Sequence, residues 1–245
     1  MEIQKREYDF KNAVQLDGTE DSTRKFMANV FMWMFVALGI SALCAYFFSH
    51  DASLLQTLYD PATGGRTTFG TIVMFAPLAF VLIMSFGINK IAYPLLLVLF
   101  IAFAALMGTS LSFIFLVYTS ALIGNVFLTT SLVFGVMAVT GYTTHTDLTK
   151  FGSIMIMALF GIIIASIVNF FMHSEQMEYI ISYIGVAVFV GLTAYDVQRL
   201  KRIGEGIEYG TASAGKMAIM GALTLYLDFI NLFLMLLRVF GGRRR

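Results

Sequence analysis

Seven apolar stretches, each close to the length of a membrane span, constrain this sequence more than any other feature. A helix needs about 20 residues to cross the roughly 30 Å hydrocarbon core of a bilayer. Because backbone polar groups in lipid must find partners within their own segment, each stretch is expected to be a helix. The predicted spans are Phe26–Phe48, Phe69–Ile88, Ala92–Phe113, Tyr118–Thr140, Phe151–Met172, Tyr179–Val197 and Met217–Phe240. The sequence therefore predicts an all-α membrane protein with seven transmembrane helices.

Composition supports this fold class and excludes several functions. Hydrophobic residues make up 58% of the 245 residues and charged residues only 13%, against about 25% charged in ordinary soluble domains. The net charge of +1 provides no basic face for nucleic acid. The single cysteine, Cys44, excludes an intramolecular disulfide and a thiolate metal cluster. The bilayer is therefore the expected partner of most of the surface.

The chain is expected to contain three regions: a polar cytoplasmic tail at residues 1–25, a seven-helix transmembrane domain at 26–241, and a basic tail at 242–245. The first 25 residues show no cleavable signal pattern, so the first span is expected to remain as an anchor. The connectors are short and polar, which predicts one compact bundle. A longer loop is expected between Gln198 and Lys216, and a very short turn between Phe113 and Tyr118.

Basic residues near the spans predict the orientation, because cytoplasmic loops carry an excess of Lys and Arg. An N-terminus inside the cell places most of them in the cytoplasm: Lys5, Arg6, Lys11, Arg24, Lys25, Lys90, Lys150, Arg199, Lys201, Arg202 and Lys216. The C-terminal arginines do not fit this rule, since seven crossings would place them outside the cell. The bias of the earlier segments is expected to dominate, although a re-entrant segment would also account for the arginines.

Small residues let helices approach closely in lipid. The glycines within the apolar runs are therefore expected to pack helices together, in particular Gly152, Gly161, Gly185 and Gly191.

Two acidic residues lie within the predicted spans, Asp196 near the end of the sixth and Asp228 in the seventh. A charged side chain at the bilayer centre costs at least about 2.5–3.5 kcal/mol, so such residues usually face the bundle interior and serve a function. If the two carboxyl groups face each other, they cannot both ionise cheaply and should titrate as one unit. Such a pair is a natural pH sensor, and its oxygens would also suit Ca²⁺.

Three neighbouring residues are expected to support this pair. Asn231 lies three residues after Asp228 on the same helical face, where its amide could bond the carboxyl group or add a ligand. Tyr195 and Arg199 flank Asp196, and Arg199 could draw it towards the interface. The alternative for each aspartate is a structural role, satisfied by a neighbouring hydroxyl or by Arg199.

Enzyme classes fit poorly, so no catalytic residues are predicted. Tyr195-Asp196 matches the Tyr-Asp half of an intramembrane aspartyl protease signature, but Leu225–Asp228 lacks the glycines of the second half. Neither a His-Glu-x-x-His nor a Gly-x-Ser-x-Gly motif is present. A retinal-binding lysine would have to lie inside the last span, and Lys216 is only at its edge.

Several segments in order resemble the Bax inhibitor-1 family in its bacterial branch, from about Arg24 to Gly241. The most specific segments are Leu225–Phe233, Leu236–Arg238, Ile181–Gly185, Gly191–Asp196, Phe127–Thr130 and Gly141-Tyr142. The resemblance implies a central last helix surrounded by the other six, in a bacterial inner membrane. It also implies a pH-sensitive Ca²⁺ leak whose sensor maps onto Asp196 and Asp228, with Ca²⁺ and protons as partners and no cofactor.

The chain departs from the family at one point. In the family an arginine of the second helix region can pair with the sixth-helix aspartate, whereas the second span here has none. The nearest base is Lys90, a weaker bidentate partner. The hypothesis is that a proton shared by the two carboxyl groups keeps the leak closed and that its loss at rising pH opens the leak. A salt bridge to Asp196 would favour the closed state when that residue is ionised, and would oppose this pH dependence. A non-catalytic protein that binds a membrane protease or stress partner remains the alternative, and a facilitator for an organic solute is also open.

Overall fold

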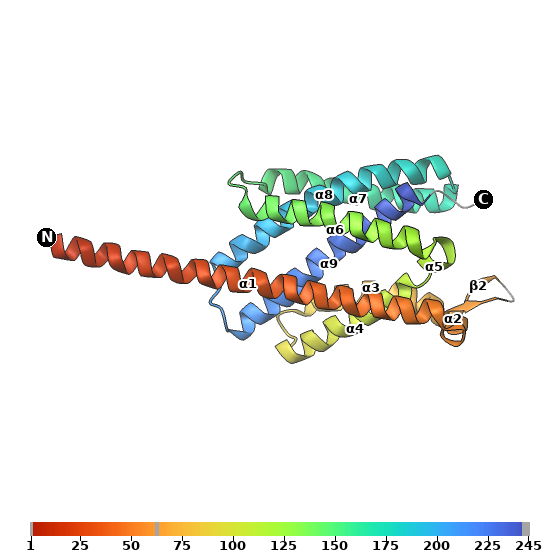
Figure 1. Ribbon diagram of the computed structural model, residues 1–245, viewed down its shortest axis with the longest axis horizontal. Coiled ribbons are helices and arrows are strands. Elements are labelled where there is room, and N and C mark those ends of the chain that lie inside the picture. The colour runs from red at the N-terminus through yellow and green to blue at the C-terminus, as the bar shows by residue number, and fades with distance from the viewer. Residues whose placement is uncertain (1, 62–63, 242–245) are drawn as a thin grey trace.

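A computed structural model describes residues 2–61 and 64–241, with side chains from residue 20 onward (Figure 1). Within these residues, seven helices are long and apolar enough to cross a membrane, which confirms the predicted fold class. The helices are α1 (Glu2–His50), α2 (Ala52–Leu58), α3 (Thr68–Gly87), α4 (Tyr93–Leu111), α5 (Ile114–Val117), α6 (Ser120–Thr143), α7 (Thr149–Met172), α8 (Glu175–Glu205) and α9 (Ala212–Phe240). Two short antiparallel strands, β1 (Tyr59–Asp60) and β2 (Gly65–Arg66), form a hairpin between α2 and α3.

Helix ends follow local sequence signals. Pro94 lies in the first turn of α4, where its missing N–H costs no hydrogen bond. Hydroxyl side chains at Thr67, Thr119, Ser174 and Thr211 accept hydrogen bonds from the first turns of α3, α6, α8 and α9. These caps satisfy backbone donors that no intrahelical carbonyl can reach.

Three parts of the chain differ most from the sequence prediction. The helix α1 begins at Glu2, so the backbone of the polar tail is helical and extends beyond the bundle (Figure 1). The helix α8 continues to Glu205, through half of the predicted loop, because charged residues outside the hydrocarbon still favour a helix. The connection after α4 contains the short α5 instead of a single tight turn. The basic tail at 242–245 lies outside the described residues.

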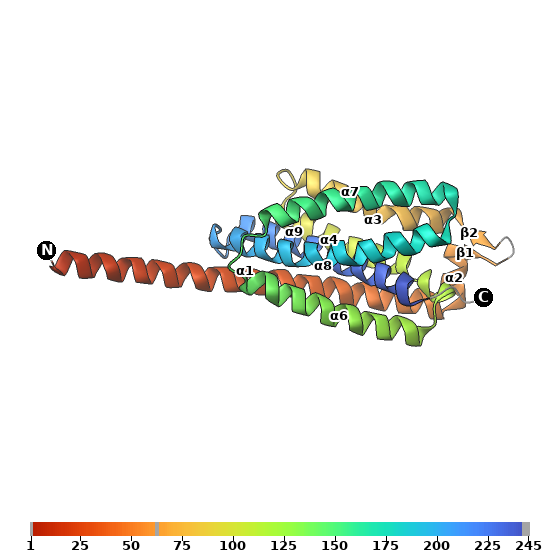
Figure 2. The same cartoon turned by 90° about the horizontal axis from the view of Figure 1, so that it is seen from above.

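The helix α9 is the most buried of the seven spans and packs against α1, α4, α6 and α8. The helices α3 and α7 lie farther out, with α3 packed mainly on α4 and α7 mainly on α8 (Figures 1 and 2). A central position surrounded by all six other spans, as the resemblance implied, is therefore not confirmed.

Glycines bring two pairs of membrane-spanning helices into backbone contact. A Cβ atom at Gly108 of α4 would overlap the backbone of Ser41 in α1, and one at Gly141 of α6 would overlap the backbone of Ala194 in α8. Of the four glycines expected to pack helices, Gly152, Gly185 and Gly191 do so against side chains. The expectation for Gly161 is wrong: nothing lies within 4 Å of its added Cβ, because this face of α7 has no neighbouring helix.

Candidate functional site

The fold brings the two membrane aspartates together. Asp196 lies on α8 and Asp228 on α9, two helices that pack along each other. Both residues are buried, with exposures of 8% and 6%. The two carboxyl groups are close enough to interact with each other, and a hydrogen bond between them would require one of them to hold a proton. Asp228 Oδ2 is fully buried without a hydrogen-bond partner, which is costly for an acceptor in an apolar interior.

One basic side chain accompanies this pair. Arg199 Nη1 lies 4.0 Å from Asp196 Oδ1, at the outer limit of an ion pair within one helix. The arginine side chain is 60% exposed, so water or headgroups compete for it. Among the residues that the structure describes, no other basic group lies within ion-pair distance of either carboxyl group. The site thus contains two acids and one loosely held cation.

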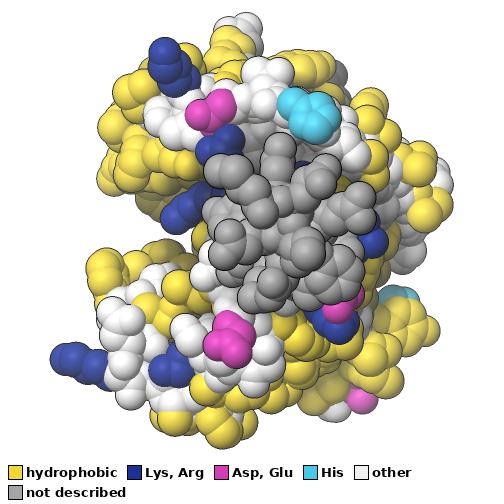
Figure 3. All heavy atoms as spheres, turned by 90° about the vertical axis from the view of Figure 1, so that its left-hand side faces the viewer, with side chains coloured by type: hydrophobic (Ala, Val, Ile, Leu, Met, Phe, Trp, Pro, Cys, Tyr) yellow, Lys and Arg dark blue, Asp and Glu magenta, His cyan; other side chains and the backbone are white. Residues whose placement is uncertain are grey.

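The aspartates line a cavity of about 930 Å³ between α3, α7, α8 and α9. Besides the acid pair and Arg199, its polar lining comprises Thr224, Asn231 and Ser166. Seen from the N-terminal end, Figure 3 shows a cleft on the left between the upper and lower halves of the bundle, with basic side chains on its wall. The aspartates thus line a cavity whose walls include α3 and α7, on the side of the bundle where these two helices lie.

The expected supporting residues take different places. Asn231 lines the cavity, but its amide nitrogen donates to Leu227 O at 2.8 Å, so its oxygen is the atom that could serve as a ligand. Tyr195 does not line the cavity, since its ring packs against Gly152 of α7. Lys90 is exposed in the α3–α4 turn and lies outside the cavity lining. The structure thus does not bring Lys90 to the aspartates.

The oxygens at this site could serve a Ca²⁺ ion in transit better than a tightly bound one. Ca²⁺ takes six to eight oxygen ligands, whereas the site offers two carboxyl groups and the Asn231 amide oxygen. No group of three or more His, Cys, Asp or Glu residues able to hold a metal occurs in the described part of the chain. Water would have to complete the coordination of any ion here.

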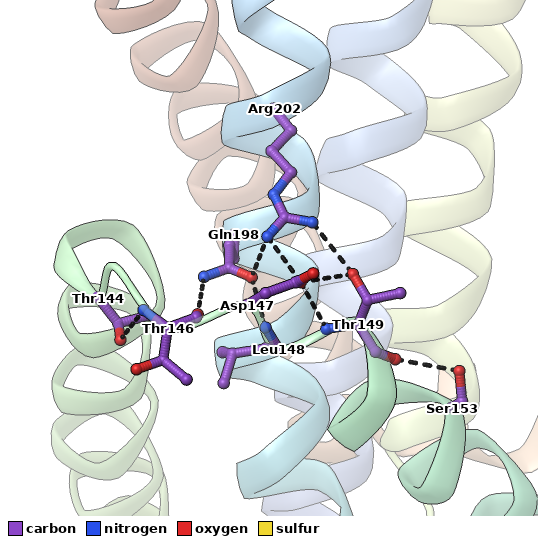
Figure 4. Close-up of polar contacts among 8 residues, drawn as sticks. All are labelled: Thr144, Thr146, Asp147, Leu148, Thr149, Ser153, Gln198 and Arg202. Carbon is purple, nitrogen blue, oxygen red and sulfur yellow. Dashed lines mark hydrogen bonds and ion pairs between the residues drawn. The ribbon is translucent and has the colours of Figure 1, made fainter.

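A polar cluster, which we call the clasp, fastens the α6–α7 loop to α8 (Figure 4). Asp147 Oδ1 accepts hydrogen bonds from the Thr149 hydroxyl and backbone N–H, and from Arg202 Nη2 at 2.7 Å. Gln198 accepts from Leu148 N and donates to Thr146 O. The Thr149 hydroxyl and then the Arg202 guanidinium hold the pKa of Asp147 well below its usual range.

The clasp was not predicted, although the sequence contains one signal for it. Gln198 and Arg202 are four residues apart and therefore share one helical face. The loop predicted between Gln198 and Lys216 places both residues outside a helix, where four-residue spacing carries no structural meaning. Their partners lie about 50 positions away, and sequence spacing cannot reveal such a pairing. Because Gln198 follows Asp196 by two residues, the clasp also anchors the part of α8 that carries Asp196.

Comparison with known proteins places this geometry in context. The family model described as "Inhibitor of apoptosis-promoting Bax1" matches residues 23–245. The chain is 47% identical to inner membrane protein YbhL of Escherichia coli strain K12, over 89% of this chain and 92% of the relative. It is 42% identical to a protein of Borreliella burgdorferi, over 90% and 93% of the two chains. A membrane protein of Streptococcus pyogenes serotype M3 is 34% identical over 89% and 92%.

Proposed function

Because this chain belongs to the Bax inhibitor-1 family, we propose that it is a pH-sensitive Ca²⁺ leak channel gated by Asp196 and Asp228. One observation carries the proposal: a buried carboxyl pair joins two neighbouring helices, and both of its members face a large cavity. Buried acids at membrane depth are costly, and in channels they mark ion and proton paths.

The shared proton is the proposed gate. While the proton is present, the carboxyl groups bond to each other and hold α8 against α9. When rising pH removes it, two negative charges face each other in a poorly solvated site, where repulsion is much stronger than in water. The contact between the two helices then loses stability, and the population shifts towards an open state.

Ca²⁺ would enter the opened site because its oxygens carry the charge that the ion needs. The two carboxylates and the Asn231 oxygen replace part of the hydration shell, and water supplies the rest. An incomplete coordination shell suits conduction, because an ion must be able to leave a site as well as enter it. The mechanism contains no catalytic step, and we assign no enzyme activity to the protein.

Similarity to an Escherichia coli inner membrane protein supports placing this chain in a bacterial inner membrane. The distribution of Lys and Arg supports a cytoplasmic N-terminus. In this orientation the clasp and Arg199 lie towards the cytoplasm, so the pair would respond to the pH of that side.

The proposal is tested by Ca²⁺ influx into liposomes that contain the purified protein and a Ca²⁺ dye, across pH 5 to 8. Influx should rise with pH in the wild type, and its pH dependence should flatten in Asp196→Asn and in Asp228→Asn. Each variant removes one ionisable group and keeps the side-chain shape, so the repulsion that opens the gate is lost.

Glu178→Gln is the matched control, because this acid lines a separate cavity near the opposite end of α8. Its pH profile should follow the wild type. No influx above that of empty liposomes, with folded protein in the membrane, would exclude the channel. Influx that falls as pH rises would assign closure to the ionised pair held by Arg199, and would reverse the gating mechanism proposed above.

A regulatory protein that binds a membrane protease or stress partner is the second candidate. The observation that favours it is the N-terminal part of α1, which extends beyond the bundle (Figure 1) and whose sequence contains Lys5, Arg6 and Lys11. Deletion of residues 2–19 distinguishes the two functions. If the protein is a channel, the deletion variant should retain Ca²⁺ influx. If it is a regulator, the deletion variant should no longer bind its partner.

A further inference from the structure

The cavity that holds the aspartates opens sideways, towards lipid. Its outer walls are α3 and α7, which pack mainly against α4 and α8 rather than against each other. Figure 2 shows both helices along the same side of the bundle, and Figure 3 shows the cleft between the two halves. A molecule dissolved in the bilayer could therefore reach the cavity without crossing water.

The walls of the cavity are apolar. They are formed by aliphatic and aromatic side chains on the facing sides of α3 and α7: Met74, Phe75, Ile163, Ile167 and Phe170. A hydrated ion gains nothing from such walls. The volume of about 930 Å³ lies within the range of roughly 300–1,000 Å³ that is typical of small-molecule sites. The walls and the volume suit a hydrocarbon chain or a ring system.

The inner end of the cavity has the opposite character. It contains the two carboxyl groups, served by a single ion pair from Arg199, and Asp228 Oδ2 is buried without a partner. A neutral hydrocarbon chain would leave this oxygen unsatisfied. A fatty acid or the phosphate of a lipid would bring negative charge towards the acid pair. A ligand with an N–H donor and a positive charge satisfies the oxygen and balances the second acid.

We propose that this cavity binds hydrophobic amines, whose ammonium group donates to Asp228 and whose apolar part lies between α3 and α7. The inference shares the acid pair with the proposed channel function, but it requires neither Ca²⁺ binding nor permeation. A bound amine would occupy the same oxygens as a Ca²⁺ ion and would therefore block a leak that passes through them.

Direct binding tests the proposal in nanodiscs of phosphatidylcholine, which carry no net charge. The probe contains a dansyl fluorophore joined by an octyl chain to a primary ammonium group. A matched probe has a hydroxyl in place of the ammonium. Binding is measured as the saturable increase in dansyl fluorescence, after the signal from empty nanodiscs is subtracted. The dissociation constant of the amine probe should be at least about tenfold lower than that of the alcohol probe. Asp228→Asn should bring the two affinities together.

Three further variants make the result specific. Asp196→Asn should weaken amine binding without affecting the alcohol, which provides a second test if Asp228→Asn does not fold. Ile163→Trp, which fills the cavity between its walls, should weaken both probes. Glu178→Gln, in a separate cavity, should change neither.

Equal affinities for amine and alcohol in the wild type would overturn the proposal and identify a site for lipid chains only. An unchanged amine affinity in both folded aspartate variants would also overturn it. The assay contains no Ca²⁺, so it is independent of the channel function. Amine binding without a leak would exclude the channel alone, and a leak without amine binding would exclude this inference alone.

Discussion

Asp147 and Asp228 show two opposite environments for a carboxyl group in the same chain. Asp147 is exposed in a loop, yet it accepts bonds from Thr149 and Arg202. Asp228 is buried in the bundle, yet one of its oxygens has no partner. A structural acid is normally satisfied where burial makes the loss of water costly. The unsatisfied oxygen therefore distinguishes Asp228 from Asp147 and supports the functional role proposed for it.

The clasp around Asp147 makes a prediction about stability and pH. In the folded protein the pKa of Asp147 is lowered, so its contribution is fully present above the unfolded pKa of about 4. That contribution is lost as pH falls through the folded pKa. Asp147→Asn should therefore lower the thermal unfolding midpoint in detergent by a constant, small amount from pH 5 to 8, and by less below about pH 4.

The control for lost negative charge is Glu205→Gln, an exposed acid near the end of α8. It should leave the unfolding midpoint close to that of the wild type throughout. A difference for Asp147→Asn that grows as the solution becomes more acidic would contradict the role of the ionised carboxylate.

Among the helices, the pairing of α6 with α8 depends on the absence of a side chain. An added Cβ at Gly141 would overlap the backbone of Ala194, and backbone cannot move aside as a flexible side chain can. Ala194 lies two residues before Asp196, so this contact sets the position of the same segment of α8 that carries the acid. The clasp and Gly141 thus both hold this segment of α8, one through polar contacts with the α6–α7 loop and the other through backbone contact with α6.

Gly141→Ala should lower the free energy of unfolding by about 1–3 kcal/mol, because overpacking forces the backbones apart. Gly135→Ala is the matched control on the same helix, since nothing lies within 4 Å of its added Cβ. It should be neutral or stabilising by up to about 1 kcal/mol, as alanine favours a helix more than glycine does. Unfolding by denaturant in detergent measures both.

If Gly135→Ala were also destabilised, the loss of stability in Gly141→Ala could not be attributed to the close approach of its Cβ to Ala194. Helix propensity and lipid contact would then determine the free energies of unfolding of both variants. The same contact links structure to the proposed function. Gly141→Ala should also shift the pH profile of Ca²⁺ influx, because the separation of α6 and α8 moves Asp196 relative to Asp228.

For the molecule as a whole, the number of spans decides which side each end occupies. Within the described residues seven helices can cross the membrane, and α1 enters the bundle at the end opposite to where α9 leaves it (Figure 1). With seven crossings, the start of the first span and the end of the last lie on opposite sides of the membrane. The basic residues after α9 would by themselves favour the cytoplasm.

We therefore expect a cytoplasmic N-terminus and an outward C-terminus. In a bacterial host, a fusion of green fluorescent protein should fluoresce at the N-terminus, and a fusion of alkaline phosphatase should be active at the C-terminus. Alkaline phosphatase fused at the α6–α7 loop, next to Lys150 in the first turn of α7, is the internal control and should be inactive. Activity of that internal fusion would show that the protein has the opposite orientation.

The sequence by itself determined the class of fold, the number of spans and the position of two acids within those spans. These follow from hydropathy and from the cost of charge in lipid, which act on each segment separately. It also identified Asn231 as a neighbour of Asp228, because helical spacing is local.

Only the tertiary structure decided what lies between the segments. Charged residues after Asp196 suggested a loop, whereas α8 continues to Glu205 and its Arg202 closes the clasp. Lys90 was close to the right span in sequence, yet it lies away from the acids. The sideways cavity depends on α3 and α7 packing on different neighbours. Hydropathy cannot predict that choice, because lipid and a neighbouring helix offer an apolar face nearly the same environment.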